Sequence, residues 1–292
     1  MIFPSTFSIV AYDPQAQAWG IAVACKFLAV GSVVPWARAG IGAVATQSYA
    51  NTSFGPRGLD FMEEGLSASQ ALERLLADDP ERELRQVGLV DHQGGSATFT
   101  GKSCYSWAGG VAGQNFAAQG NILAGEQVVA ALVETFTKTN KDLPHRLLAA
   151  LLAGDRSGGD RRGRQSAAIY VVKSKGGYGG FNDRWVDYRV DDHPDPVLRL
   201  GELLELHALY FSKSGESDQV KLEGDVLYHL QMILSRLGYY QDRPSNQYDE
   251  KTRAALEAFM GNENFEERVD IKTGKIDKPV YEHILRQFGN EK

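Results

Sequence analysis

Cysteine is nearly absent from this chain of 292 residues, and other familiar signals are missing too. Only Cys25 and Cys104 occur, and their spacing matches neither a disulfide framework nor a cysteine-based zinc site. No apolar run approaches the ~18 residues that a membrane-spanning helix needs, so no membrane partner is expected. The formal net charge of -6 argues against broad contact with phosphates, so a nucleic-acid partner is not expected either.

The N-terminal segment MIFPSTFSIVAYD lacks the basic region and the small-residue cleavage site of a secretory signal. We therefore expect a cytoplasmic protein. Hydrophobic residues make up 43% and charged residues 23% of the sequence, which is typical of globular proteins. The length is sufficient to bury a core without disulfides or structural metals.

Glycine is concentrated early in the chain, which points to two domains. Only 6 of the 31 glycines follow residue 214. The segment Ser212–Ser217 reads as a linker, so we place a boundary near Gly215. Residues 1–214 are expected to form a strand-rich domain, and residues 215–292 a small helical one.

The first domain combines strand-like runs with amphipathic helical patterns. Its strands are expected at 6–12, 19–25, 41–47, 86–91, 96–100, 116–119, 167–173 and 185–190. Helices are expected to begin after the capping residues Ser67 and Asp142, at about Glu126, and after Pro196. Both faces of the run 6–12 are apolar, which indicates a strand in the middle of a layered α+β structure with a largely antiparallel sheet.

Thr6 stands at the start of that first strand and is the sharpest catalytic candidate. If the chain began at Thr6, its α-amine would have a pKa of about 7.7–8.0 and could accept the proton of the Thr6 hydroxyl. One residue would then supply both the nucleophile and the base. The alternative is a structural threonine, since Thr is common at strand starts.

The first two strands should form a hairpin, and its register decides which residue faces Thr6. With a turn near Gln15–Ala16, Thr6 lies opposite either Cys25 or Lys26, and the sequence leaves both possibilities open. A nearby Lys26 ammonium would lower the pKa of the amine and favour a developing alkoxide. Alternatively, Lys26 is a solvated residue at the end of a strand.

Ten segments of the first domain closely resemble one uncharacterised bacterial and archaeal family with an N-terminal-nucleophile (Ntn) hydrolase-like domain. They are Thr6–Ala11, Val23–Phe27, Val33–Arg38, Gly42–Gln47, Gly55–Gly58, Leu84–Gly88, Gln119–Leu123, Gly159–Ser166, Tyr178–Arg184 and Val190–Pro194. The resemblance implies a four-layer αββα sandwich, and it implies no established substrate.

The chain departs from this family where five residues precede Thr6. Members commonly begin Met-Thr, whereas Met1–Ser5 stands before Thr6 here. Because Ile2 is too bulky for ordinary removal of Met1, hydrolase activity would require cleavage between Ser5 and Thr6.

The polar motifs supply candidate substrate-binding residues, each with a structural alternative. Arg161, Arg162 and Arg164 could clamp a substrate carboxylate, or pair with Asp155 and Asp160 in a solvated loop. Asn121 could donate to an oxyanion or belong to an ordinary turn.

Four further residues are candidates for the lining of a pocket. Arg38 and Gln47 flank the third strand, and Asn182 and Asp183 follow a glycine-rich loop. The run Asp191–Asp195 suits a helix entry better than a metal site, so neither a metal nor another cofactor is expected.

The second domain is expected to contain three helices, with apolar faces at 226–237, 252–259 and 280–288. Its order of motifs resembles the small three-helix peptidoglycan-binding domain, although the Asp-Gly turn of that family is missing before Tyr248. The alternative is a helical module that contacts the first domain or another subunit.

Together these features predict an Ntn-hydrolase-like domain followed by a peptidoglycan-binding-like module. The preferred function is hydrolysis of an amide in a small molecule or a peptide, such as a muropeptide, by a homo-oligomer. The rival is a binding or scaffold protein that uses the fold without N-terminal catalysis.

Overall fold

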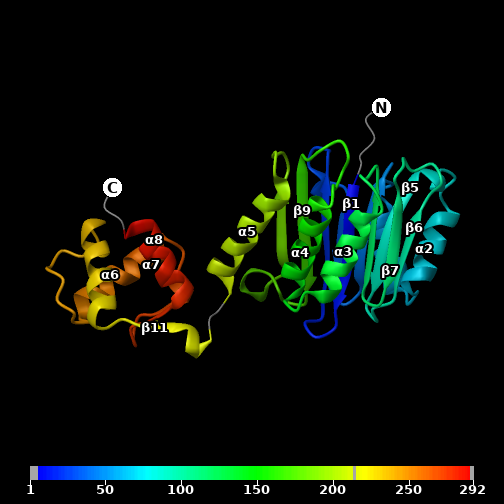
Figure 1. Cartoon of the computed structure of the whole chain (residues 1–292). Coiled ribbons are helices and arrows are strands. Elements are labelled where there is room, and N and C mark those ends of the chain that lie inside the picture. Colours follow the sequence, from blue (N-terminus) through cyan, green and yellow to red (C-terminus); the bar gives the residue numbers. More distant parts are fainter. Residues whose placement is uncertain (1–5, 213–214, 290–292) are drawn as a thin grey trace. The chain divides into compact units, whose positions relative to one another are not determined.

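The computed structural model describes residues 6–212 and 215–289 (Figure 1). The chain divides into two compact units, Met1–Leu204 and Glu205–Lys292. This division falls within helix α5 (Pro196–Phe211), earlier than the expected boundary near Gly215. Within the described ranges, no helix combines the length and apolar character needed to cross a membrane.

The first unit contains two antiparallel sheets. The larger sheet has six strands in the order β10-β9-β2-β1-β8-β7, and the smaller has four in the order β3-β4-β5-β6. The larger sheet comprises β1 (Thr6–Asp13), β2 (Ala18–Cys25), β7 (Gly109–Gly113), β8 (Phe116–Asn121), β9 (Ser166–Lys173) and β10 (Arg184–Val190). The smaller comprises β3 (Pro35–Arg38), β4 (Gly42–Ser48), β5 (Arg85–Asp91) and β6 (Ser96–Thr100).

Helices cover the outer face of each sheet, as Figure 1 shows for α3 and α4 on the larger sheet and α2 beside the smaller one. The helices of this unit are α1 (Phe54–Glu63), α2 (Ala68–Ala77), α3 (Gln127–Lys138), α4 (Leu143–Arg156) and the part of α5 up to Leu204. One apolar core lies between the larger sheet and its helices, a second between the sheets, and a third between the smaller sheet and α1 and α2. The order of layers is helix, sheet, sheet, helix.

The alternation of β1 explains its central position. Phe7, Ile9 and Ala11 pack in the helix-side core, whereas Val10 and Tyr12 pack between the sheets. This two-sided burial confirms the sequence prediction for the strand.

The predicted strands and helices of the first unit are present, and the structure contains further elements that were not predicted. The eight expected strands are present, and Ser67 forms the predicted capping box of α2. Strands β3 and β7 and helix α1 were not predicted from the sequence. Glycine and proline weaken the strand and helix patterns of two of these elements, because β7 reads GGVAG and α1 begins FGP.

The second unit has the three expected helices, α6 (Gly224–Arg236), α7 (Glu250–Asn262) and α8 (Lys278–Phe288), around one apolar core. It also has a small sheet that the sequence analysis missed, in the order β11 (Gln219–Lys221), β13 (Lys275–Asp277) and β12 (Val269–Asp270). A buried ion pair between Arg268 and Asp277, 2.6 Å long, joins the loop before β12 to β13. The protein therefore has a mixed α+β domain followed by a small, mostly helical domain.

Candidate functional site

Thr6 lies in a row of small polar side chains across the end of the larger sheet. It is directly opposite Cys25 on β2 and Asn121 on β8, and Ser166 on β9 continues the row beyond Cys25. Directly opposite residues of antiparallel strands share a face, so these side chains project together. The hairpin thus adopts the register that pairs Thr6 with Cys25, not the alternative with Lys26.

The Thr6 hydroxyl contacts the Cys25 thiol. Their Oγ1 and Sγ atoms are 3.3 Å apart, and both residues are buried. Burial raises the pKa of Cys25 to about 12, although the hydrogen bond with Thr6 opposes this shift. Cys25 is therefore a neutral thiol near pH 7 and lacks the thiolate that a nucleophilic cysteine uses.

An arginine–aspartate pair closes the row on the side of β2. The buried Asp160 carboxylate accepts from the backbone N–H of Lys26 at 2.7 Å and pairs with Arg162 at 3.0 Å. Arg162 also hydrogen-bonds Cys25, and its charge opposes the rise of the pKa of that thiol. The Lys26 ammonium instead donates to the carbonyl of Arg164 at 3.1 Å. Arg162 is therefore the cation that contacts the row.

A chain of buried hydrogen bonds continues from Thr6 into the layer between the sheets. Ser8 donates to Gln47 Oε1 at 2.6 Å and accepts from Gln119 Nε2 at 2.7 Å. Gln47 Nε2 lies 3.3 Å from the Thr6 carbonyl and 2.9 Å from Gln86 Oε1. The fully buried Gln47 therefore joins β4 of the smaller sheet to β1 of the larger one.

Gln86 holds Asn121 in place. Its Oε1 atom accepts from Asn121 Nδ2 at 2.9 Å, while its own Nε2 donates to the carbonyl of Gly120 at 2.8 Å. Buried amides are stable when their donors and acceptors are matched in this way. The side chain opposite Thr6 is consequently fixed from the second sheet.

A glycine makes room for this amide layer. A Cβ atom at Gly88 would lie 2.1 Å from Gln119 Oε1, so any side chain there would displace the Gln119 amide. Gly88 is on β5, directly opposite Thr98 of β6, and the Thr98 hydroxyl lies 3.2 Å from the same Gln119 oxygen. The sequence therefore leaves a gap in one sheet where the amide of the other sheet inserts.

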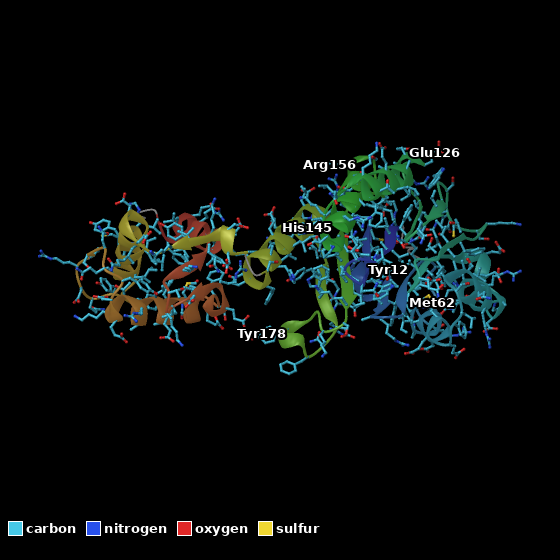
Figure 2. All side chains as sticks on the ribbon, turned by 90° about the horizontal axis from the view of Figure 1, so that it is seen from below. Tyr12, Met62, Glu126, His145, Arg156 and Tyr178 are labelled. Atoms are coloured by element: carbon cyan, nitrogen blue, oxygen red, sulfur yellow. The ribbon has the colours of Figure 1, made fainter. Side chains whose placement is uncertain are left out.

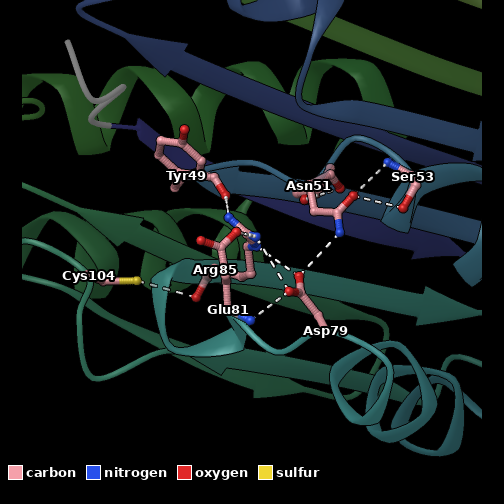
Figure 3. A network of polar contacts seen from close by, with 8 residues as sticks. Tyr49, Asn51, Ser53, Asp79, Glu81, Arg85 and Cys104 are labelled. Carbon is pink, nitrogen blue, oxygen red and sulfur yellow. Dashed lines mark hydrogen bonds and ion pairs between the residues drawn. The ribbon is translucent and has the colours of Figure 1, made fainter. Parts of the chain in front are cut away.

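A second polar network fixes the chain that leaves β4 at this end (Figure 3). Arg85, opposite Ser48, forms a buried ion pair with Asp79 at 2.8 Å and donates to the carbonyl of Tyr49 at 2.8 Å. The hydrogen bond from Arg85 holds the pKa of Asp79 below its usual range. This network anchors Tyr49, two residues beyond Gln47.

The other predicted binding residues do not join the Thr6 row. Arg38 lies at the opposite end of β4 from Gln47 and pairs with Asp60 at 2.9 Å and with Glu63. Asn182 and Asp183 accept backbone hydrogen bonds in the turn between β9 and β10, at the far end of the larger sheet.

The arginines predicted to clamp a carboxylate lie in the loop beside Asp160. Arg164 pairs with Asp155 at 2.8 Å and Asp195 at 3.1 Å, as in the ion-pair alternative. Arg161 is exposed. A hollow of about 380 Å³ adjoins this loop, lined by Asp155, Arg156, Gly158, Asp160, Gly163, Arg164 and Pro194. Among the described residues, no cluster of His, Cys, Asp or Glu could hold a metal ion.

Ser8 and Gln86 were not predicted as site residues from the sequence, whereas Arg162 and Asp160 were expected in their loop, as a carboxylate ligand or as an ion pair. A signal for Ser8 and Gln86 was present, because each alternates along its buried strand with apolar residues that face the helices. Polar side chains at inward positions of buried strands require partners, and that requirement predicts a polar inter-sheet layer.

These observations define a two-domain α+β protein with a polar site at one end of the space between two sheets. Residues 6–200 match the model described as "Family of unknown function (DUF1028)". The chain belongs to this family. Residues 210–284 match the model described as "Putative peptidoglycan binding domain".

Two solved structures resemble the chain to different degrees. Protein SPO2555 from Silicibacter pomeroyi, of the same family, shares 31% identity with a TM-score of 0.64, over 73% of this chain and 88% of that one. Anbu (ancestral beta-subunit) from Yersinia bercovieri shares 10% identity with a TM-score of 0.31, over 72% and 98%, which is too weak to bear on function. No curated protein matches the chain.

Proposed function

We propose that the first domain is an αββα hydrolase of the N-terminal-nucleophile type, which cleaves an amide bond in a small molecule or a short peptide. The observation that carries this proposal is the position of Thr6 at the head of a central strand, with its hydroxyl against a neutral thiol and between fixed polar neighbours. The layered arrangement and the family resemblance of the motifs support it. Activity requires that cleavage between Ser5 and Thr6 frees the Thr6 amine.

The reaction would proceed in two steps at Thr6. The neutral α-amine accepts the hydroxyl proton while Oγ1 attacks the substrate carbonyl, and the amide nitrogen leaves with a proton from the ammonium. An ester between Oγ1 and the acyl group remains. Water, deprotonated by the same amine, then cleaves the ester and restores the hydroxyl.

The neighbours would act on charge and position. Arg162 hydrogen-bonds Cys25, which lies on the strand next to Thr6. Its positive charge would stabilise the negative charge that develops near Thr6 when Oγ1 attacks the carbonyl. Asn121, held by Gln86, offers an amide group on the other side of Thr6. Lys26 then has a structural part, through its contacts with Asp160 and Arg164.

The experiment compares Thr6→Ala and Thr6→Ser in protein whose N-terminus has been mapped. Hydrolysis of a panel of N-acyl amino acids and muropeptides should be lost in Thr6→Ala and retained in part by Thr6→Ser, with unchanged circular dichroism. Hydrolysis that persists in Thr6→Ala would exclude Thr6 from the mechanism. Absence of hydrolysis in correctly processed wild-type protein would favour the non-catalytic scaffold.

A second function, cell-wall binding, is favoured by the family match of residues 210–284. We propose that the helical domain binds peptidoglycan fragments and brings them to the first domain. Full-length protein should be retained on insoluble peptidoglycan, whereas a 1–214 truncation should pass through. Equal retention of both proteins would remove this role.

A further inference from the structure

The outer edge of β10 and the two ends of that strand form a self-complementary surface. β10 is the last strand of the larger sheet, and in the part of the chain that the structure describes no strand pairs with its outer edge. We propose that two copies of this chain pair along β10 in an antiparallel, two-fold manner, which would join two six-stranded sheets into one. This inference is independent of the chemistry at Thr6.

The backbone of β10 determines which residues face outward. Lys173 donates its N–H to the Asp183 carbonyl at 3.0 Å, so alternate β9 residues such as Val171 and Ile169 also direct their backbone groups toward β10. These residues lie opposite Val186 and Tyr188. The N–H and C=O groups of the intervening residues Asp187 and Arg189 must therefore point away from β9, toward the open edge.

Charge then selects one register. Two-fold antiparallel pairing joins outward-facing residues to each other, which allows symmetry centres at residues 187, 188 and 189. A centre at Asp187 stacks Asp187 on the partner's Asp187, and a centre at Arg189 stacks Arg189 on the partner's Arg189. A centre at Tyr188 instead pairs Asp187 of each copy with the partner's Arg189, which gives two opposite-charge pairs. This register is favoured, because like charges directly opposite each other destabilise the other two.

Within the described part of the chain, Asp187 forms only long ion pairs, so it can form a shorter one with a partner copy. Arg189 Nε is 3.8 Å from Asp187 Oδ1, and Arg184 Nη1 is 3.4 Å from Asp187 Oδ2. Both arginine side chains are about half exposed or more, at 46% and 67%. The carboxylate can therefore gain a partner across the two-fold axis without breaking a short ion pair.

Apolar side chains lie at both ends of the same edge. Tyr178 and Phe181, at the tip of the β9–β10 hairpin, are 82% and 92% exposed, and Figure 2 shows Tyr178 projecting from the domain. Leu28, which is 58% exposed, lies at the other end, where the next residue, Ala29, donates to the Asp191 carbonyl. Antiparallel pairing brings the aromatic tip of each copy to the end of the partner's β10 that carries Leu28, so exposed apolar side chains of the two copies gather there.

The first test is the mass of the full-length protein in sedimentation velocity at about 10–100 μM. We expect a dimer in the wild type and at least a tenfold weaker dimer in Arg189→Asp. The charge-swapped double variant Asp187→Arg/Arg189→Asp should restore the dimer, because the swapped pair is still complementary in the Tyr188-centred register. Lys138→Asp, which changes an exposed side chain at the end of α3, serves as the control and should dimerise like the wild type.

A monomeric wild type, an unaffected Arg189→Asp dimer, or failure of a folded charge swap to restore pairing would each overturn the proposal. If Arg189→Asp does not fold, Phe181→Ser changes only an exposed side chain and should also weaken the dimer. Tyr188→Cys supplies an independent readout, because residues at the two-fold axis of a non-hydrogen-bonded pair lie within disulfide range, about 4.5–5.5 Å between Cα atoms. Mild oxidation should cross-link Tyr188→Cys but not the exposed control Leu198→Cys, and equal cross-linking would contradict the register.

Discussion

The hydroxyl of Thr6 and the thiol of Cys25 lie 3.3 Å apart on directly opposite residues of β1 and β2. This relationship makes a buried, neutral thiol the immediate neighbour of the candidate nucleophile. A thiolate there would repel the alkoxide that forms during attack, whereas a thiol can donate to it or accept from it. The raised pKa of Cys25 thus suits the proposed chemistry.

The same pKa predicts a loss of stability at alkaline pH. The folded pKa of Cys25 is about 12, above the value of about 8.5 expected in the unfolded chain. Its contribution to folding is therefore complete below about pH 8.5 and is lost progressively as the pH rises toward 12. Urea unfolding of the wild type and Cys25→Ala between pH 8 and pH 11 should show a shallower decline in the variant. Parallel curves would contradict the buried neutral thiol.

The Arg85–Asp79 pair should contribute strongly to the stability of the first domain. Asp79→Asn leaves the exposed Glu81 carboxylate as the remaining acidic partner of the buried Arg85 guanidinium, so the cost should approach the about 3–5 kcal/mol of a broken buried pair. The exposed neighbour Asp78, which pairs with Arg57, offers a matched comparison, and Asp78→Asn should cost less than about 1 kcal/mol. Chemical denaturation measures both. Similar values for the two variants would show that burial does not determine the strength of the Arg85 pair.

Because the layer between the sheets is polar at Gln47, an apolar substitution there should lower the stability of the protein. Gln47→Met keeps the volume but removes the acceptor of the buried Ser8 hydroxyl, at about 1–3 kcal/mol for such an unsatisfied group. Gln86 Oε1 loses one of its two donors and keeps Asn121. The exposed Gln93→Met should change the free energy of unfolding by no more than about 0.5 kcal/mol. A Gln47→Met protein as stable as the wild type would mean that the amide chain is not needed to join the sheets.

Arg162 should matter more than its neighbour Arg161. Arg162→Gln removes the cation at Cys25 and is expected to lower kcat/KM for amide hydrolysis at least about tenfold, with partial rescue by Arg162→Lys. Arg161→Gln changes an exposed side chain and should have a smaller effect. A rise in KM confined to Arg161→Gln would instead support the carboxylate-clamp hypothesis. Steady-state kinetics on the processed protein distinguishes these outcomes.

Most of the fold could be predicted from the sequence, because its signals are local. The two-sided apolar run of β1 and the caps at Ser67 and Asp142 each depend on residues a few positions apart. The short β3 and the glycine-rich β7 carry too few side chains to show a period, so their pairing could be recognised only in the sheets.

Less of the site was predictable, because stacking of the two sheets creates it. Gln86 and Asn121 are 35 positions apart and meet only when β5 faces β8. The choice between Cys25 and Lys26 opposite Thr6 depended on a single step of register, which a turn sequence does not determine. Asp160 and Arg162 reach β2 from a distant loop, so their proximity to Cys25 had no signal in the sequence.

The central claim is that Thr6 acts with its own freed amine, and the N-terminus of the protein purified from its native cells tests it most directly. Intact mass and N-terminal sequencing of the fraction that hydrolyses amides should identify a chain that begins at Thr6. Hydrolysis by protein that still carries Met1–Ser5 throughout would contradict the account.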